Sequence, residues 1–368
     1  DCIITTLDLN IQKAAIEAAE EITHGAVVVC GAKTGEIYAI LSKPDFDLND
    51  VASSFDKTDS PLLNRALSAY SVGSVFKPCV AAAAFSENKE NIIYECVGKA
   101  KIIDREFNCH KRDGHGIMDL KSALENSCNQ SFIQIGARLG KEGFCSYFAA
   151  FGLRGATGID LPAEPKKSLY YTADRMGPVE LASCAFGQSS KISYLEMAAA
   201  VCAVVNGGKL MRPYVVSDIL APDGSLIEHI GPACTRQVLK AETSAVMREM
   251  MEAVVLYGGG RNAQIAGYRV GGKSGTSQKL DSADEKARIA SFVAVAPIDD
   301  PQFLCLVCLD EPHSWTTAGG SLSAPVCAEV LEQTLVSKGL LRAAVPDAST
   351  SEPTAADLPA DGDSFDGA

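Results

Sequence analysis

Apolar segments that resemble β-strands lie at the two ends of the chain, and segments with helical spacing lie between them. Near the N-terminus, residues 26–30 and 36–41 flank a turn over residues 31–35. Near the C-terminus, residues 289–298 and 303–309 flank Asp299-Asp300-Pro301. Strands joined by so few residues must pair antiparallel. The most economical fold is one antiparallel sheet built from both ends of the chain.

Helical spacing of apolar residues marks the segments that would cover this sheet. An opening helix is expected over residues 8–22, with Thr6 as a candidate N-cap, and a closing helix over residues 324–338. Further helices are expected over residues 79–85, 120–140, 194–205 and 241–256. We therefore expect an α+β domain over residues 1–340, with a helical subdomain inserted at about residues 90–255.

Residues 343–368 differ from the rest of the chain in composition. They carry six acids and no base among Ala, Ser, Thr and Pro residues. Such a segment buries too little apolar surface to fold, which predicts a disordered acidic tail.

The net charge argues against two classes of partner, and the hydropathy argues against a membrane-crossing segment. The 368 residues have a formal net charge of −13, which argues against nucleic-acid binding and against adhesion to anionic lipid. The longest unbroken apolar run is residues 197–205. A spanning helix needs about 20 such residues, so no membrane-crossing segment is expected within this sequence.

A serine followed three residues later by a lysine occurs three times. The copies that begin at Ser54 and Ser86 lie in polar surroundings, whereas Ser74-Val-Phe-Lys77 follows Gly73 and precedes an apolar helix. One helical turn brings the lysine within reach of the hydroxyl, and a lysine with a depressed pKa can accept the serine proton. This context favours Ser74 as a nucleophile and Lys77 as its base; the simpler alternative is a helix cap.

A Ser-x-Asn element follows in the expected helix over residues 120–140. In Ser127-Cys128-Asn129, the hydroxyl would relay a proton between the nucleophile and a leaving amine. The amide of Asn129 would hold a substrate carbonyl and orient Lys77. In isolation the pattern is weak, because Ser86-Glu-Asn88 has the same form.

The third element is Lys273-Ser274-Gly275-Thr276, which follows a short strand-like segment. A lysine and hydroxyls on a strand edge would hold a substrate carboxylate, and Gly275 would let the substrate backbone approach. The N–H groups of Thr276 and Ser74 would form an oxyanion hole. Residues 267–274 also fit a phosphate-binding loop, but that loop must open a helix, and the segment after Ser274 has almost no apolar face.

The three elements in this order resemble the transpeptidase domain of class B penicillin-binding proteins. The resemblance extends from Thr5 to about Gly339 and includes the flanking segments TTLDLNIQKAA, NRALSAYSVGSVFKP, GPVELASCAFGQSS and VGGKSGTSQK. Within the class, the chain is most similar to the stage V sporulation protein D and elongation-type members of Gram-positive spore formers.

The resemblance implies a serine β-lactamase/D,D-transpeptidase fold and cross-linking of peptidoglycan stem peptides through a Ser74 acyl-enzyme. It implies no cofactor for acyl transfer, acylation by β-lactams and a glycosyltransferase partner. It also implies a preceding membrane helix that anchors the domain at the extracytoplasmic face. No Glu-bearing deacylation loop is recognisable, so hydrolysis should be slow. The alternatives are a β-lactam sensor or serine β-lactamase on the same fold, or a non-catalytic cell-wall scaffold.

The thirteen cysteines fall into two groups. Six are expected to be small core residues: Cys30, Cys79, Cys202, Cys305, Cys308 and Cys327. In contrast, Cys96, Cys109, His115 and Cys128 have ligand types that suit a structural zinc site, with His110 or Asp104 as substitutes for Cys96. Similarity to elongation-type and clostridial relatives favours zinc, and the alternative is a Cys96–Cys109 disulfide with a buried Cys128.

Overall fold

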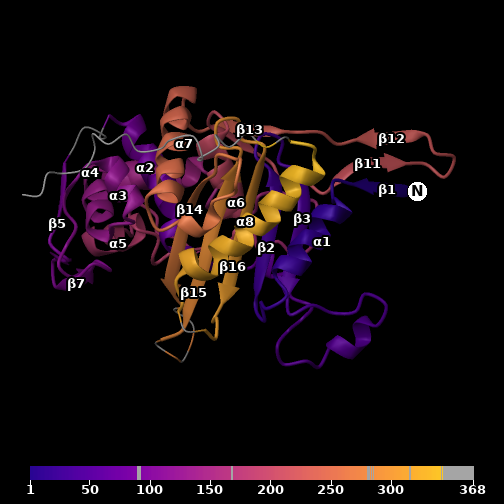
Figure 1. The fold of residues 1–368 in the computed structure, drawn as a ribbon, viewed down its shortest axis with the longest axis horizontal. Helices are drawn as coiled ribbons and strands as arrows, with labels where there is room; N and C mark the ends of the chain where they lie inside the picture. The colour runs from indigo at the N-terminus through magenta and orange to yellow at the C-terminus, as the bar shows by residue number, and fades with distance from the viewer. Residues whose placement is uncertain are drawn as a thin grey trace, which may run out of the picture.

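The computed structural model describes residues 1–88, 93–166, 169–279, 282, 284, 286–314, 316–340 and 342. Its central sheet has five antiparallel strands in the order β14-β15-β16-β2-β3 (Figure 1). The strands are β14 (Gly271–Gln278), β15 (Arg288–Ala296), β16 (Phe303–Asp310), β2 (Gly25–Gly31) and β3 (Ile37–Lys43). Because β16 pairs with β2, the two ends of the chain share one sheet, as predicted.

Two helices, α1 (Leu9–Ala18) and α8 (Gly319–Ser337), pack against each other and cover one face of the sheet (Figure 1). Ile11 of α1 and Leu331 of α8 are buried in one apolar cluster with Phe292 of β15. The N-cap of α1 is Asp8, whose carboxylate accepts hydrogen bonds from two backbone N–H groups. The expected Thr6 cap is wrong, because the Thr6 hydroxyl donates to the Ile37 carbonyl at 2.7 Å.

On the other side of the sheet lie the helices from the middle of the chain, which pack mainly on one another. These are α2 (Lys77–Ser86), α3 (Leu120–Glu125), α4 (Asn129–Ala150), α5 (Pro178–Ala185), α6 (Tyr194–Val205) and α7 (Ala241–Leu256). Beyond its first turn, which contains Glu196, helix α6 is apolar on nearly all sides, as befits a helix that is buried along most of its length. It contacts the sheet through β2 and β16. The six predicted core cysteines are all buried.

Short strands and 3-10 turns complete the fold. Strands β1 (Cys2–Thr5), β11 (Val216–Leu220) and β12 (Leu226–His229) form a small sheet. The two-stranded pairs are β4 (Ala69–Ser71) with β9 (Lys191–Ser193), β5 (Tyr94–Cys96) with β8 (Gly116–Met118), β6 (Lys99–Ile102) with β7 (Arg105–Asn108), and β10 (Lys209–Met211) with β13 (Cys234–Gln237). The 3-10 turns are η1 (Val51–Ser54), η2 (Arg65–Leu67), η3 (Gly73–Phe76) and η4 (Arg261–Ala263).

Two further expectations concern the acidic tail and membrane-crossing segments. The predicted acidic tail, residues 343–368, lies outside the described residues. Among the residues that are described, no helix combines the length and apolarity needed to cross a bilayer.

Candidate active site

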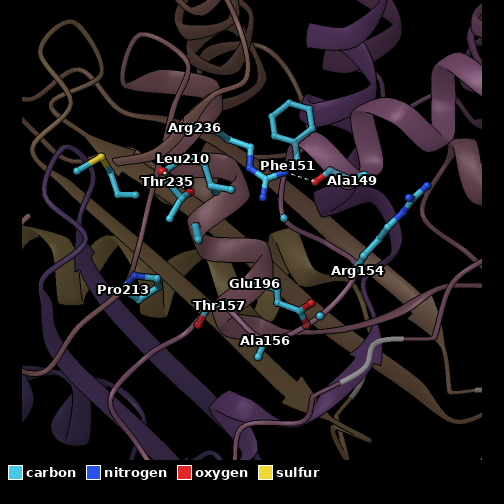
Figure 2. Close-up of a pocket in the computed structure, with 14 residues that line it drawn as sticks. Ala149, Phe151, Arg154, Ala156, Thr157, Glu196, Leu210, Pro213, Thr235 and Arg236 are labelled. Atoms are coloured by element: carbon cyan, nitrogen blue, oxygen red, sulfur yellow. Dashed lines mark hydrogen bonds between the residues drawn. The ribbon is translucent and has the colours of Figure 1, made fainter. Parts of the chain in front are cut away.

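The three sequence elements meet at one cleft of about 730 Å³. Its lining includes Ser74 from the first element, Ser127 and Asn129 from the second, and Ser274 and Thr276 from the third. A separate hollow of about 410 Å³ near α6 and β10 shares no lining residue with this cleft and contains none of the predicted site residues (Figure 2). The cleft is therefore the candidate active site.

Ser74 lies at the start of a continuous helical segment, in η3 directly before α2. Gly73 has φ +58°, a conformation that favours glycine, and its N–H donates to the Gly187 carbonyl at 2.9 Å. This turn places Ser74, half-buried, on the cleft. No described residue hydrogen-bonds to its hydroxyl, which leaves the Ser74 oxygen open toward the cleft.

The Lys77 side chain is fully buried and points toward the second element. Its Nζ donates to the Ser127 carbonyl at 2.7 Å and the Asn129 Oδ1 at 2.8 Å, and it lies 3.2 Å from the Ser127 hydroxyl. Burial lowers the pKa of Lys77 to about 7, although the thiols of Cys128 and Cys109 act in the opposite direction. A lysine with this pKa is partly neutral near neutral pH and can accept a proton.

Ser127 occupies a break between two helices. The single helix expected over residues 120–140 is wrong, because α3 ends at Glu125 and α4 begins at Asn129. Ser127 has φ +49°, the left-handed conformation that commonly ends a helix and usually belongs to glycine. The break turns both the carbonyl and the hydroxyl of Ser127 toward Lys77.

The third element lies on β14, which is an edge strand of the central sheet. Lys273 is fully buried, and its Nζ donates to the Ser274 carbonyl at 2.8 Å. Burial and the nearby charge of Lys77 lower the pKa of Lys273 well below its usual value. A strand at this position also agrees with the rejection of the phosphate-binding loop, which would require a helix after Ser274.

Gly275 allows β14 to pack closely against the nucleophile segment. A Cβ at this position would lie 2.6 Å from the Ser291 hydroxyl and 3.2 Å from the Val75 side chain. The missing side chain therefore faces the protein interior, so any contact of Gly275 with substrate would come from its backbone. The same two segments are joined where the Ser277 hydroxyl donates to the Ser71 carbonyl at 2.5 Å.

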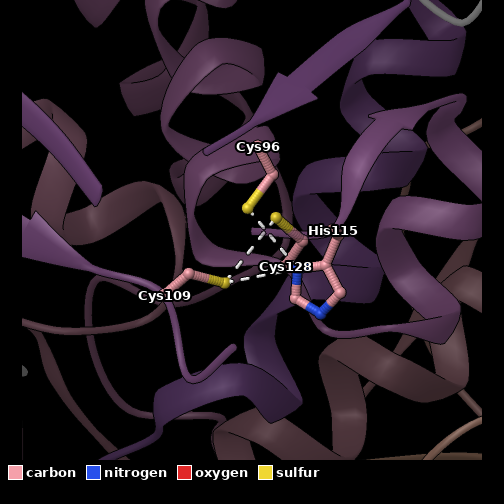
Figure 3. Close-up of side chains that lie close together, drawn as sticks. All are labelled: Cys96, Cys109, His115 and Cys128. Carbon is pink, nitrogen blue, oxygen red and sulfur yellow. Dashed lines mark hydrogen bonds between the residues drawn. The ribbon is translucent and has the colours of Figure 1, made fainter. Parts of the chain in front are cut away.

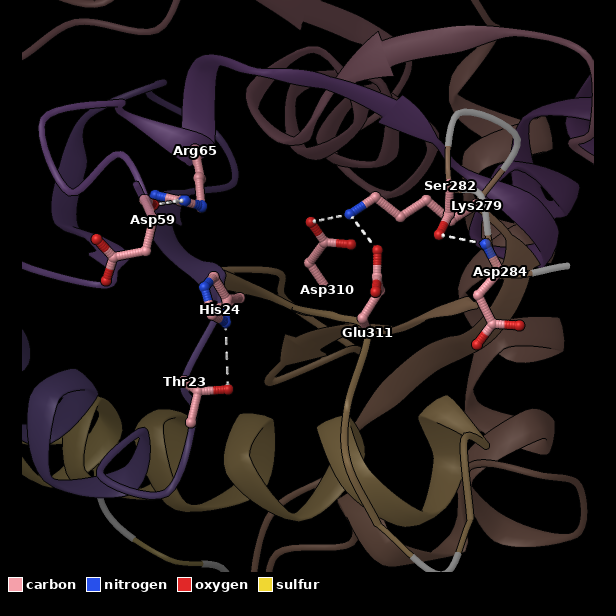
Figure 4. Close-up of polar contacts among 9 residues, drawn as sticks. All are labelled: Thr23, His24, Asp59, Arg65, Lys279, Ser282, Asp284, Asp310 and Glu311. Carbon is pink, nitrogen blue, oxygen red and sulfur yellow. Dashed lines mark hydrogen bonds and ion pairs between the residues drawn. The ribbon is translucent and has the colours of Figure 1, made fainter. Parts of the chain in front are cut away.

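The far end of β14 is held by an ion-pair cluster (Figure 4). Lys279 Nζ lies 2.9 Å from the Asp310 carboxylate and 2.7 Å from that of Glu311. Since Lys279 follows β14 and Asp310 ends β16, the cluster joins these strands across the end of β15.

Beside the second element, Cys96, Cys109, His115 and Cys128 converge (Figure 3). Their ligand atoms all lie within 4.8 Å of one another, with Cys96 Sγ 3.4 Å and Cys109 Sγ 3.5 Å from His115 Nδ1. The hydrogen bond between Cys109 and Cys128 lowers the pKa of the Cys109 thiol and raises that of the Cys128 thiol, and burial lowers the pKa of His115. A thiolate and a neutral imidazole are the forms that bind metal.

Sequence reasoning missed several residues of the cleft wall. They are His110, Glu125, Asn126, Phe186, Gln188, Tyr257, Gly258, Gly259, Arg261, Thr316, Thr317 and Ala318. The run of three glycines at residues 258–260, shortly before the third element, was the available signal, because such a run marks a loop that approaches other backbone closely. The remaining residues come from distant parts of the sequence and carry no local signature.

An antiparallel sheet covered by helices, with serine and lysine residues converging on the edge of β14, defines the class of serine acyl-transfer enzymes to which penicillin-binding proteins belong. The chain belongs to the family of penicillin binding protein transpeptidase domains, whose model matches residues 25–332. The predicted resemblance and fold class are thereby confirmed.

Curated relatives support the family. Stage V sporulation protein D of Bacillus subtilis is 37% identical over 351 residues, which cover 91% of this chain and 53% of the relative. A probable peptidoglycan D,D-transpeptidase FtsI of Caulobacter vibrioides is 30% identical, over 89% of this chain and 57% of the relative. The chain thus spans little more than half the length of these relatives.

Solved structures show the same fold. The D,D-transpeptidase domain of a peptidoglycan glycosyltransferase from Eggerthella lenta matches with a TM-score of 0.84 and 28% identity, over 92% of this chain and 84% of that one. Penicillin-binding protein A of M. tuberculosis, in a ceftriaxone acyl-enzyme complex, matches with a TM-score of 0.82 and 26% identity, over 90% of this chain and 80% of that one.

Proposed function

We propose that this chain is the catalytic domain of a peptidoglycan D,D-transpeptidase that works through a Ser74 acyl-enzyme. The observation that carries the proposal is the position of Lys77. It is fully buried, hydrogen-bonded to Ser127 and Asn129, and has a pKa lowered to about 7. It lies one helical turn from Ser74, whose hydroxyl forms no hydrogen bond with any described residue.

The proposed reaction has two half-reactions. Lys77 accepts the proton of Ser74 as the Ser74 oxygen attacks the carbonyl between two terminal D-alanines. The C–N bond breaks, and the leaving amine receives a proton through Ser127. An amine of a second stem peptide then attacks the ester, which forms the cross-link and returns the proton to Ser74.

The other predicted residues bind and orient the donor peptide. Asn129 orients Lys77, which it contacts at 2.8 Å, and holds a substrate carbonyl. The hydroxyls of Ser274 and Thr276 bind the terminal carboxylate. Lys273 positions Ser274 through the hydrogen bond from its Nζ to the Ser274 carbonyl. The N–H groups of Ser74 and Thr276 stabilise the oxyanion.

A β-lactam would acylate Ser74 in the same way as the donor peptide. Structures of penicillin-binding protein A of M. tuberculosis as ceftriaxone and imipenem acyl-enzyme complexes support this step.

Incubation with a synthetic stem pentapeptide and an acceptor amine tests the proposed function. Exchange of the terminal D-alanine by wild type and its loss in Ser74→Ala are expected, whereas acylation without exchange would indicate a sensor and rapid β-lactam hydrolysis a β-lactamase. A chain that is not acylated at all would be a scaffold.

We also propose that Cys96, Cys109, His115 and Cys128 hold a structural Zn²⁺. Three sulfurs and one nitrogen within 4.8 Å are a donor set typical of closed structural sites. Cys128 lies between Ser127 and Asn129, so a metal there would fix the break between α3 and α4. His110 and Asp104 are not among the four converging residues, although His110 Nδ1 lies 4.0 Å from Cys109 Sγ.

The cellular setting follows from the family and is likewise proposed. We place the domain at the extracytoplasmic face of the cell membrane, anchored by an N-terminal helix outside this sequence, with a membrane glycosyltransferase as partner. The 37% identity to stage V sporulation protein D supports a role in sporulation. Detection of the full-length protein in forespore membrane fractions would test this placement.

A further inference from the structure

Two oppositely charged side chains outside the three catalytic elements line the cleft. Glu125 is the last residue of α3, and Arg261 is the first residue of η4. They lie at neighbouring parts of the wall because the glycine-rich loop before Arg261 packs on the end of α3. A Cβ on Gly258 would lie 2.5 Å from the Glu125 carbonyl oxygen.

Neither charge is neutralised within the described part of the protein. Glu125 is half-buried, and no described residue forms a hydrogen bond or ion pair with its carboxylate. Arg261 is exposed and donates from Nη2 to the Tyr257 carbonyl at 2.9 Å, which leaves most of its five N–H donors free. An unpartnered carboxylate and an unpartnered guanidinium on one cleft wall can each bind a group of the opposite charge, which points to a ligand that carries both charges.

The position of this wall indicates which substrate it meets. The same loop borders the third element, because a Cβ on Gly259 would lie 3.6 Å from the Ser274 hydroxyl. In the proposed function, Ser274 binds the carboxylate of the D-alanine that leaves. The acceptor amine enters where the leaving amine departs, so the loop lies on the acceptor side of the cleft.

We propose that Glu125 and Arg261 form an acceptor subsite that selects an amine with a carboxylate on the same carbon. Glu125 attracts the incoming ammonium group, and Arg261 binds the adjacent carboxylate through paired N–H donors. A simple alkylamine offers only the first of these contacts. This assignment rests on the proposed transpeptidase function and specifies its acceptor.

The test uses two acceptors and one donor, a stem-peptide thioester that acylates the enzyme. The acceptors are meso-diaminopimelate, which has the carboxylate, and cadaverine, which lacks it. For each variant, kcat/KM is measured with both acceptors. In Arg261→Gln, the ratio of diaminopimelate to cadaverine kcat/KM should fall roughly 10- to 100-fold, and Arg261→Lys should restore part of it. Glu125→Gln should lower kcat/KM for both amines.

Control experiments distinguish failure of this subsite proposal from failure of the proposed transpeptidase function. Glu20→Gln and Arg342→Gln remove exposed charges outside the cleft and should keep the wild-type ratio. An unchanged ratio in Arg261→Gln, or an equal loss with both acceptors, would overturn the subsite. If wild type forms no acyl-enzyme with the thioester or with benzylpenicillin, the proposed function itself fails, which is a distinguishable result.

Discussion

The ammonium nitrogen of Lys77 lies 3.2 Å from the hydroxyl oxygen of Ser127 and 2.7 Å from its carbonyl oxygen. Residues 50 positions apart in the sequence therefore share one buried polar contact. Because Ser127 and Asn129 together supply its hydrogen-bond acceptors, the amine keeps one orientation beside the nucleophile.

Replacing Lys77 by arginine should abolish base catalysis. Arginine keeps a positive charge but does not deprotonate in proteins, so it cannot accept the Ser74 proton. We expect the second-order rate of acylation by benzylpenicillin to fall at least about 100-fold, the lower range for loss of a general base. Stopped-flow or mass-spectrometric acylation rates measure this, and a rate within tenfold of wild type would contradict the assignment.

Acylation should depend on pH through Lys77. The active form is the neutral amine, and burial lowers its pKa to about 7. The acylation rate should therefore rise as pH increases through 7 and level off above it. Rates measured from pH 5.5 to 9 provide the test; a profile that is flat, or that falls as pH increases through 7, would show that neutral Lys77 is not the base.

Because the backbone of Ser127 is left-handed, two replacements of this residue distinguish its effect on stability from its effect on catalysis. Both Ser127→Gly and Ser127→Ala remove the hydroxyl, but only glycine adopts φ +49° without strain. Ser127→Gly should be more stable than Ser127→Ala by about 1 kcal/mol in denaturant unfolding, while both lose a similar share of D-alanine exchange. Equal stabilities would mean that the break between α3 and α4 relaxes in the variants.

Zinc should accompany the folded protein and stabilise it. Elemental analysis should give about one zinc per chain, and chelation should lower the melting temperature and the acylation rate because the metal fixes the Ser127 turn. Cys128→Ser should lose the metal, whereas Cys234→Ser, which alters an exposed cysteine outside the cluster, should keep it. Zinc-free protein with unchanged acylation would contradict the site, and thiol mapping would then test the Cys96–Cys109 disulfide.

The fold was largely predictable because its signals are local. Apolar runs that flank short turns fix β2, β3, β15 and β16, and strands so closely joined can only pair antiparallel. Uniformly apolar or amphipathic segments likewise marked α6 and α7 at their observed bounds. The order and spacing of the three short elements identified the family.

The details of the site depend on contacts that sequence spacing does not encode. Helical periodicity continues through residues 120–140, so nothing local revealed the break at Ser127; a left-handed turn at a serine gives no compositional signal. The cap of α1 went to Asp8 instead of Thr6 because β3 offered Thr6 a carbonyl partner. The wall formed by Glu125 and Arg261 exists only after α3 and the glycine loop pack together.

Intact mass spectrometry after incubation with benzylpenicillin tests the central claim most directly. Wild type should carry one stable adduct that peptide mapping places on Ser74, and Ser74→Ala should carry none. A folded, metal-replete wild type without an adduct, or an adduct that persists in Ser74→Ala, would contradict Ser74 as the nucleophile of this site.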